Sequence, residues 1–349
     1  MISSSARLGK CLKIKARDIQ IEEGCVIGDN VEVCSEKFHV GKNTRIGEGV
    51  SIASYEKFSI GKNCIVGKNA RFNARSIEIG DFFYSDNNPV PLRIGGGGSN
   101  RPTARIKIGS RCVMHDSFIN VAMPVEIGDD VGFSPESKII THGFWNSVIE
   151  GYGSEFAPVK IGNHVIIGYR AIILPGVSIG DYCSIGAGAV VTRSFEPNCV
   201  IAGVPAKVIK SKPDYPKQLT FEEKVGIMKK LMEEYAELLQ DKVDKVVLTK
   251  KDDSTVISGE FRTKDFQIIF STQKFPSSQT RSIRLAFEDL PVSDKDFSIN
   301  IAKQTWNGPD DEITDDLRDF LRHYGIRIFS RHFQSIPPKI KRNLEESQY

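Results

Sequence analysis

The sequence predicts a mainly β fold: a parallel β-helix built from six-residue repeats, followed by an α-helix and a small α+β domain. The chief observation is a period of six. From Ile161 the chain reads IGNHVI, IGYRAI, ILPGVS, IGDYCS and IGAGAV, and an aliphatic residue opens each hexad. A period of six matches neither the 3.6 residues of a helix turn nor the alternation of a strand, but it suits a coil of three short strands. Stacked coils bury one continuous core.

The same rhythm occurs earlier in the chain, at Ile21, Val40, Ile60, Ile108 and Ile127. We therefore assign residues 1–212 to the β-helix. The seven cysteines are odd in number and none is spaced CxxC, which argues against a disulfide framework. Four of them fill the small position of a hexad and are interpreted as core packing. They are Cys25, Cys64, Cys112 and Cys183.

Two insertions interrupt the repeats. Residues 81–104 are rich in Gly, Pro and Asn and are predicted to form a loop. Their four glycines, 95–98, could cradle a phosphate, but no strand–loop–helix context supports that reading. The second insertion, residues 142–158, contains the candidate catalytic residue.

Beyond the repeats, residues 213–244 are predicted to form a linker and an amphipathic helix. Pro213 and Pro216 end the hexads, and Thr220 with Glu223 forms a capping-box signature. The apolar stripe of this helix could lie on the β-helix or form a short coiled coil between subunits.

Residues 245–349 are predicted to form a small α+β domain whose role the sequence does not indicate. Three strands, a helix and a final strand are expected, in the order Val246–Thr249, Phe266–Ser271, Phe297–Lys303, Glu312–Tyr324 and Ile326–Phe329.

Composition narrows the classes of partner. The 349 residues carry a formal net charge of only +3, so the sequence argues against nucleic acid as the main partner. No stretch reaches the roughly 18 apolar residues that a membrane span needs. A cytoplasmic location without integral membrane association is therefore expected.

The stretch Val159–Lys210, with its hexads and its PAKVIK exit, resembles the hexapeptide-repeat acyltransferases. Its pattern is most similar to maltose, galactoside and xenobiotic acetyltransferases and to sugar acetyltransferases of polysaccharide pathways. The resemblance is strong over residues 100–210, weaker over 20–80 and absent from the C-terminal third. It implies a left-handed parallel β-helix, a homotrimer, and acetyl-CoA as co-substrate in clefts between neighbouring prisms.

The resemblance also implies site residues. His142, in SPESKIITHGF, matches the catalytic base, and Asn120 matches the acceptor-site asparagine only loosely. Ile166 replaces the tryptophan that is common in the penultimate coil. Small residues could leave a slot for the pantetheine arm, and basic residues could bind phosphates. The expected coenzyme-binding residues are Gly168, Tyr169, Ala187, Thr192, Arg193, Lys207 and Lys210.

A histidine suits this chemistry because a thioester is already reactive, whereas the acceptor alcohol must lose a proton. Asn120 or a backbone N–H could stabilise the developing oxyanion. Trp145, Glu150 and Tyr152 in the second insertion could hold a sugar ring, or the loop could only cap the coil. His115 is a rival base.

The expected function is acetyl-CoA-dependent O-acetylation of a carbohydrate, with a small-molecule or saccharide acceptor and no metal. Two alternatives remain open: N-acetylation of an amino sugar, free or nucleotide-linked, and a non-catalytic β-helix scaffold. A γ-class carbonic anhydrase shares the β-helix but needs three zinc-binding histidines, two of them closely spaced. His115, His142 and His164 contain no such pair.

Overall fold

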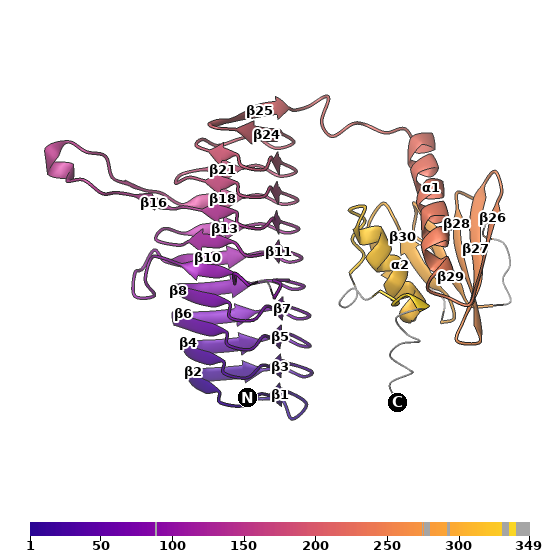
Figure 1. Ribbon diagram of the computed structural model, residues 1–349, viewed down its shortest axis with the longest axis horizontal. Helices are drawn as coiled ribbons and strands as arrows, with labels where there is room; N and C mark the ends of the chain where they lie inside the picture. Colours follow the sequence, from indigo (N-terminus) through magenta and orange to yellow (C-terminus); the bar gives the residue numbers. More distant parts are fainter. Residues whose placement is uncertain (88, 274, 276–279, 292–293, 330–334, 340–349) are drawn as a thin grey trace. The chain divides into compact units, whose positions relative to one another are not determined.

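The computed structural model describes residues 1–349 except 88, 274, 276–279, 292–293, 330–334 and 340–349. The chain divides into two units, Met1–Gln218 and Leu219–Tyr349. Among the described residues, the first unit is a stack of parallel coils and the second contains a six-stranded sheet with two α-helices (Figure 1). The predicted fold class, a left-handed parallel β-helix followed by a helix and a small α+β unit, is confirmed.

In the first coils, long parallel strands bend around one corner of the prism and so contribute to two walls. Register shifts between Ser35 and Lys37 and between Ser54 and Lys57 accompany the bends. We call the wall before this corner the first wall and the wall after it the second. The long strands are β2 (Lys13–Ile21), β4 (Glu32–Val40), β6 (Ser51–Ile60) and β8 (Arg71–Ile79).

Strand β8 is the point at which the two walls separate. Its first half pairs with β9 through Arg71 and Arg93, and its second half pairs with β10 through Ser76 and Arg105. The first wall continues through β9 (Arg93–Gly95), β12 (Phe118–Asn120), β15 (Lys138–Ile139), β20 (Ile172–Ile173) and β23 (Val190–Val191). The second wall continues through β10 (Arg105–Ile108), β13 (Val125–Ile127), β18 (Val159–Ile161) and β21 (Ser178–Ile179).

The third wall consists of short strands along the whole stack. Tyr84 bridges Ile65 to Val113 and so joins its lower and upper parts. β25 pairs antiparallel with β24 at the last coil. The strands are β1 (Arg7–Leu8), β3 (Val26–Ile27), β5 (Arg45–Ile46), β7 (Ile65–Val66), β11 (Val113–Met114), β14 (Gly132–Phe133), β19 (Ile166–Ile167), β22 (Ser184–Ile185), β24 (Val200–Gly203) and β25 (Ala206–Lys210).

One core fills the prism, because the opening aliphatic residue of each hexad points inward. Phe38, Phe58 and Phe72 contact one another through successive coils, with ring centroids 5.8 and 5.4 Å apart in a tilted and an edge-to-face pair. Corner glycines allow the coils to stack closely: a Cβ on Gly162 would lie 2.3 Å from the carboxylate of Asp181 in the next coil. The four hexad cysteines are buried, as the repeat pattern predicted.

Both insertions leave the prism at the corner between the first and second walls. The first is shorter than the sequence indicated, because residues 81–95 supply the Tyr84 bridge and strand β9, and only residues 96–104 form an excursion. The second is a hairpin in which β16 (His142–Gly143) pairs with β17 (Glu155–Phe156) and η1 (Val148–Glu150) lies between them. We call it the arm; Figure 1 shows it projecting from the prism.

The second unit is built on a six-stranded mixed sheet that follows chain order. Helix α1 (Phe221–Gln240) begins at the predicted capping box, formed by Thr220 and Glu223. Its apolar face packs into the core of this unit with Ile257 and Phe270. The remaining elements are β26 (Lys245–Lys250), β27 (Ser254–Phe261), β28 (Lys264–Ser271), β29 (Ser282–Ala286), β30 (Phe297–Asn300), β31 (Thr305–Asn307) and α2 (Glu312–Arg322).

Two details of the second unit differ from the sequence prediction. Helix α1 belongs to the α+β unit rather than to a separate segment 213–244, because its apolar stripe covers the sheet. Residues 326–329 contribute the buried Ile328 to the core without forming a strand. Within the described residues, no helix combines the length and the apolar character needed to cross a membrane.

Candidate active site

His142 lies where the chain leaves the first wall and enters the arm. It is the first residue of β16, and its side chain is half-buried. Its ring stacks on that of Phe156, its partner in the hairpin, with centroids 5.4 Å apart and planes inclined by 15°. The hairpin pairing thus holds the imidazole at the base of the arm.

Asn120 contacts His142 directly from the coil below. It ends strand β12, and only 4% of its surface is exposed. The Asn120 Oδ1 lies 2.9 Å from the His142 Nδ1, 2.5 Å from the Thr141 hydroxyl and 3.2 Å from the Ala122 N–H. The hydroxyl and the N–H are donors that require an acceptor, which orients the amide oxygen toward them. His142 Nδ1 then carries the hydrogen, and Nε2 keeps its lone pair.

Gly96 fits against the other side of the same amide. Its φ is +90°, and a Cβ there would lie 2.3 Å from Asn120 Nδ2. Thr103 ties the same excursion to the coil through a 2.7 Å hydrogen bond to the Ala122 carbonyl. The first excursion therefore buttresses Asn120, which gives Gly96 a structural role unrelated to phosphate binding.

A groove of about 530 Å³ opens beside His142 at the base of the arm. It extends from His142 toward the next coil up the stack, where Leu174 and Pro175 occupy the same corner. Its other lining residues are Ile140, Gly143, Gly153, Ser154 and Glu155.

Two predicted coenzyme residues share this corner with His142. Thr192 and Arg193 follow strand β23, one coil beyond Leu174, and both are exposed. The Arg193 guanidinium lies over the ring of Phe195, 5.4 Å from its centroid. Lys207 and Lys210 are exposed on β25 at the end of the stack.

The other predicted coenzyme residues lie at the corner between the third and first walls. The Tyr169 hydroxyl donates a 2.6 Å hydrogen bond to Glu136, which also pairs with Arg170. Arg170 and then Tyr169 lower the pKa of Glu136, and the same carboxylate raises the pKa of Tyr169.

Gly168 and Ala187 belong to the same corner, one coil apart. A Cβ on Gly168 would lie 2.7 Å from the Ala187 N, so close coil stacking already requires glycine there. Within one chain, the first wall therefore separates Thr192 and Arg193 from Gly168, Tyr169 and Ala187, while Lys207 and Lys210 lie on the third wall at the end of the stack.

The predicted acceptor residues of the arm do not gather around His142 in one chain. Trp145, Glu150 and Tyr152 are exposed on the projecting hairpin, and Trp145 is 94% exposed.

The other histidines lie at different corners. His115 forms a 2.6 Å contact with Asp86 at the corner between the third and first walls. His164 stacks on Tyr182 at the corner between the second and third walls.

Sequence reasoning did not identify Thr141, Gly96 and Phe156 as parts of the site. Thr141 precedes His142 in the quoted motif, but its hydrogen bond to Asn120 depends on how two coils stack. Nothing in the local sequence indicates that Gly96 lies against Asn120. Across the described ranges, no cluster of three or more His, Cys, Asp or Glu side chains is arranged to hold a metal ion.

Family comparisons match the repeat region. The model described as Bacterial transferase hexapeptide (six repeats) matches residues 158–193, and Hexapeptide repeat of succinyl-transferase matches residues 58–81. Galactoside O-acetyltransferase of Escherichia coli (strain K12) is 40% identical over 101 residues, which is 28% of this chain and 50% of that protein.

A second relative is 2,3,4,5-tetrahydropyridine-2,6-dicarboxylate N-acetyltransferase of Enterococcus faecalis (strain ATCC 700802 / V583). It is 48% identical over 64 residues, covering 18% of this chain and 28% of that protein. The chain thus spans half or less of the length of these relatives. A solved galactoside acetyltransferase in complex with coenzyme A aligns with a TM-score of 0.34 and 30% identity, over 46% of this chain and 68% of that one.

Proposed function

Because the chain belongs to the hexapeptide-repeat acyltransferase family, we propose that it transfers an acetyl group from acetyl-CoA to a hydroxyl of a carbohydrate, with His142 as the general base. The observation that carries this proposal is the hydrogen bond between Asn120 and His142. It assigns the proton to Nδ1 and leaves Nε2 free to accept another. His142 lines a groove, and we propose that the acceptor reaches Nε2 through it.

In the proposed reaction, His142 Nε2 accepts the proton of the acceptor hydroxyl while its oxygen attacks the thioester carbonyl carbon. The new C–O bond forms, the C–S bond breaks, and the departing thiolate takes the proton from Nε2. The products are the O-acetyl ester and CoA. General-base catalysis of this kind contributes on the order of 10²–10⁴-fold.

Asn120 acts here as a positioning residue. Its oxygen faces the imidazole and its nitrogen faces Gly96, so we assign it to fixing the tautomer of His142 and stabilising the imidazolium. This replaces the oxyanion role considered from the sequence. A carbonyl oxygen opposite Nδ1–H stabilises the ring more strongly once the ring is charged.

We further propose that the active unit is a homotrimer in which acetyl-CoA binds between neighbouring prisms. Thr192 and Arg193 lie at one edge of the first wall and Gly168, Tyr169 and Ala187 at the other, so two copies could bring both sets to one coenzyme molecule. The third wall supports self-association, because many of its outward positions are apolar, as expected of a subunit interface. They include Ile65, Tyr84, Val113 and Ile166.

The exposed arm fits the same assembly. Trp145 and Tyr152 leave a large apolar surface uncovered in one chain, and we propose that the arm contacts the acceptor or a neighbouring copy. Arg193, Lys207 and Lys210 would bind coenzyme phosphates through charge-assisted hydrogen bonds. The cytoplasmic location expected from the sequence stays a prediction.

N-acetylation of an amino sugar is the alternative reaction. It is favoured by the similarity to the N-acetyltransferase of Enterococcus faecalis, whereas the similarity to galactoside O-acetyltransferase favours O-acetylation. The base at position 142 serves either acceptor. Matched sugars that differ only in one group, such as glucose and glucosamine, would separate the two reactions.

The first test is calorimetric titration of the full chain with acetyl-CoA, followed by measurement of CoA release with galactosides, glucosamine and oligosaccharides. Saturable binding and acceptor-dependent release are expected. Absence of acetyl-CoA binding would contradict the proposal and favour a non-catalytic scaffold.

A further inference from the structure

The first wall carries a row of cations immediately below the His142 site. Arg71 pairs in register with Arg93, Arg93 with Phe118, and Phe118 with Lys138, so these four residues occupy one column on successive coils. The three basic side chains are exposed, and Phe118 is half-exposed. We call these four residues the cationic row.

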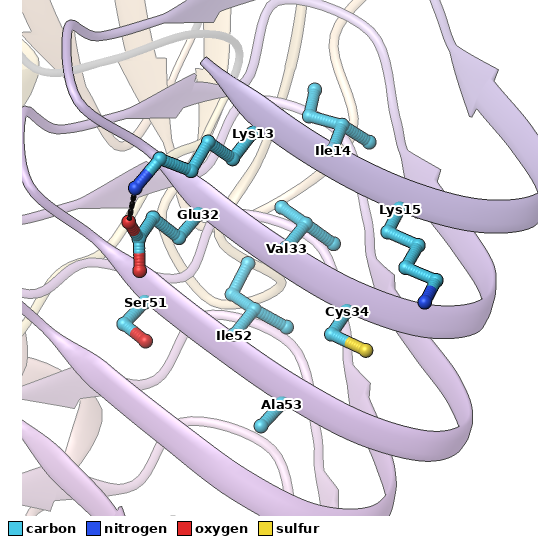
Figure 2. Close-up of a pocket in the computed structure, with 9 residues that line it drawn as sticks. All are labelled: Lys13, Ile14, Lys15, Glu32, Val33, Cys34, Ser51, Ile52 and Ala53. Carbon is cyan, nitrogen blue, oxygen red and sulfur yellow. Dashed lines mark hydrogen bonds and ion pairs between the residues drawn. The ribbon is translucent and has the colours of Figure 1, made fainter. Parts of the chain in front are cut away.

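Cations elsewhere on the β-helix are commonly paired with a carboxylate on an adjacent coil. On the second wall, Lys57 pairs with Glu78 and Lys160 with Glu126. Lower on the first wall itself, Lys13 lies 2.6 Å from Glu32, a pair drawn in Figure 2. This alternation of sign across neighbouring strands is the arrangement that stabilises a sheet.

The cationic row departs from this pattern. Arg71 and Arg93 are directly opposite each other, and like charges at such positions destabilise a sheet. In the part of the chain that the structure describes, neither these two arginines nor Lys138 forms an ion pair. The Arg93 guanidinium instead lies over the ring of Phe118, 5.7 Å from its centroid. An anionic ligand would offset this repulsion.

The row leads directly to the candidate site. Phe118 lies two residues before Asn120 on strand β12, and Lys138 lies four residues before His142. Below the row, the same column continues through Ser51, Glu32 and Lys13, where the two charges form an ion pair. These residues and their neighbours Lys15, Cys34 and Ala53 line a hollow of about 420 Å³ on β2, β4 and β6 (Figure 2).

We propose that the cationic row binds the carboxylate or phosphate groups of an extended anionic saccharide, whose reacting hydroxyl lies at His142. This proposal rests on the proposed function and specifies its acceptor. The arginine forks bind carboxylate and phosphate through paired hydrogen bonds. Successive strands are about 4.8 Å apart, so the row presents charges over several coils to a chain rather than to a single sugar.

The test compares binding of three oligosaccharides to the full chain by calorimetry: hexagalacturonic acid, a phosphorylated maltohexaose and neutral maltohexaose. The double variant R71Q/R93Q removes two charges from the row. The matched control K107Q/K160Q removes two charges from the second wall, where both lysines are exposed.

The wild type is expected to bind at least one of the two anionic oligosaccharides at least about tenfold more tightly than maltohexaose, and more weakly as salt rises from about 50 to about 300 mM. The variant R71Q/R93Q should lose about tenfold in that affinity, and the control less than twofold. Whichever anionic oligosaccharide binds more tightly identifies carboxylate or phosphate as the preferred group.

Three results would overturn the proposal: equal affinity for charged and neutral oligosaccharides, an equal loss in both double variants, or a loss of acetyl-CoA affinity in R71Q/R93Q. The last result would place the row in the coenzyme site. Selective binding of an anionic oligosaccharide without any acetyl-CoA binding would support the role of the cationic row in saccharide binding. The same result would reject acetyl transfer as the function of the chain. Saccharide binding by the cationic row and acetyl transfer at His142 can therefore be rejected independently of each other.

Discussion

The amide oxygen of Asn120 lies 2.9 Å from Nδ1 of His142, although the two residues are 22 positions apart in the chain. They meet because one residue ends a first-wall strand and the other begins the arm one coil later. The contact therefore depends on the stacking of coils, and the excursion containing Gly96 supports it from the far side.

Substitution of Asn120 by Ala should lower kcat roughly 10- to 100-fold, because the imidazole loses its orienting acceptor and the partner of its charged form. Steady-state kinetics would measure kcat and KM, and calorimetry would measure acetyl-CoA affinity, which should change little. Asn120→Asp retains the acceptor oxygens and should recover part of kcat. A rise in KM with unchanged kcat would argue instead for direct acceptor binding.

Substitution of His142 by Ala should reduce kcat by on the order of 10²–10⁴-fold, the usual contribution of a general base. Oligomeric state and acetyl-CoA affinity should remain close to those of the wild type. His115→Ala is the matched control, because His115 lies at another corner beside Asp86. Near-native turnover in the His142 variant, or a comparable loss in the His115 variant, would refute the assignment.

Substitution of Gly96 by Ala should lower both stability and kcat. The residue has a φ of +90°, and the added Cβ would meet the Asn120 amide at 2.3 Å. A cost of about 1–2 kcal/mol is expected, measured as a shift in the denaturation midpoint. Gly153→Ala is the control, since a Cβ there meets nothing within 4 Å. Equal midpoints for the two variants would contradict the buttressing role of the excursion.

Cysteine labelling should distinguish the core positions from the surface. Burial raises the pKa of Cys64 and of Cys112 to about 12, so at pH 8 both thiols stay protonated as well as covered. Native protein treated with iodoacetamide should be modified first at Cys11 and Cys34, which are exposed. Peptide mass spectrometry would map the sites, and labelling in denaturant should reach the remaining five. Rapid native labelling of Cys64 would show that the coils open.

The β-helix was the part of the fold that the sequence predicted, because the hexads repeat along it. An inward aliphatic residue every six positions fits three short strands per coil, and this spacing recurs between Ile21 and Val191, interrupted by the two insertions and by the long bent strands of the first coils. The second unit lacks a comparable repeat, so β27, β29 and β31 were not predicted. The apolar stripe of α1 indicated a buried face but could not indicate which surface covers it.

The sequence predicted individual residues of the site but not the contacts between them. The motif around His142 identified the candidate base, and Asn120 was matched only loosely. Their contact, the support from Gly96 and the separation of Tyr169 from Arg193 by one wall all follow from which strands stack above one another. Those relationships depend on insertion lengths at the corners, which local sequence patterns do not encode.

The sharing of β8 between two walls has a mechanical consequence. Below β8, the strands run around the corner without a break in the chain, and ladders of backbone hydrogen bonds on both sides of the bend join each coil to the next. Above it, the same edge is a series of separate connections that can be lengthened without disturbing the layers beneath. The coils below β8 thus form a braced support, whereas the corner connections above β8 can change in length. The site residues on those connections can therefore vary while the coils below stay the same.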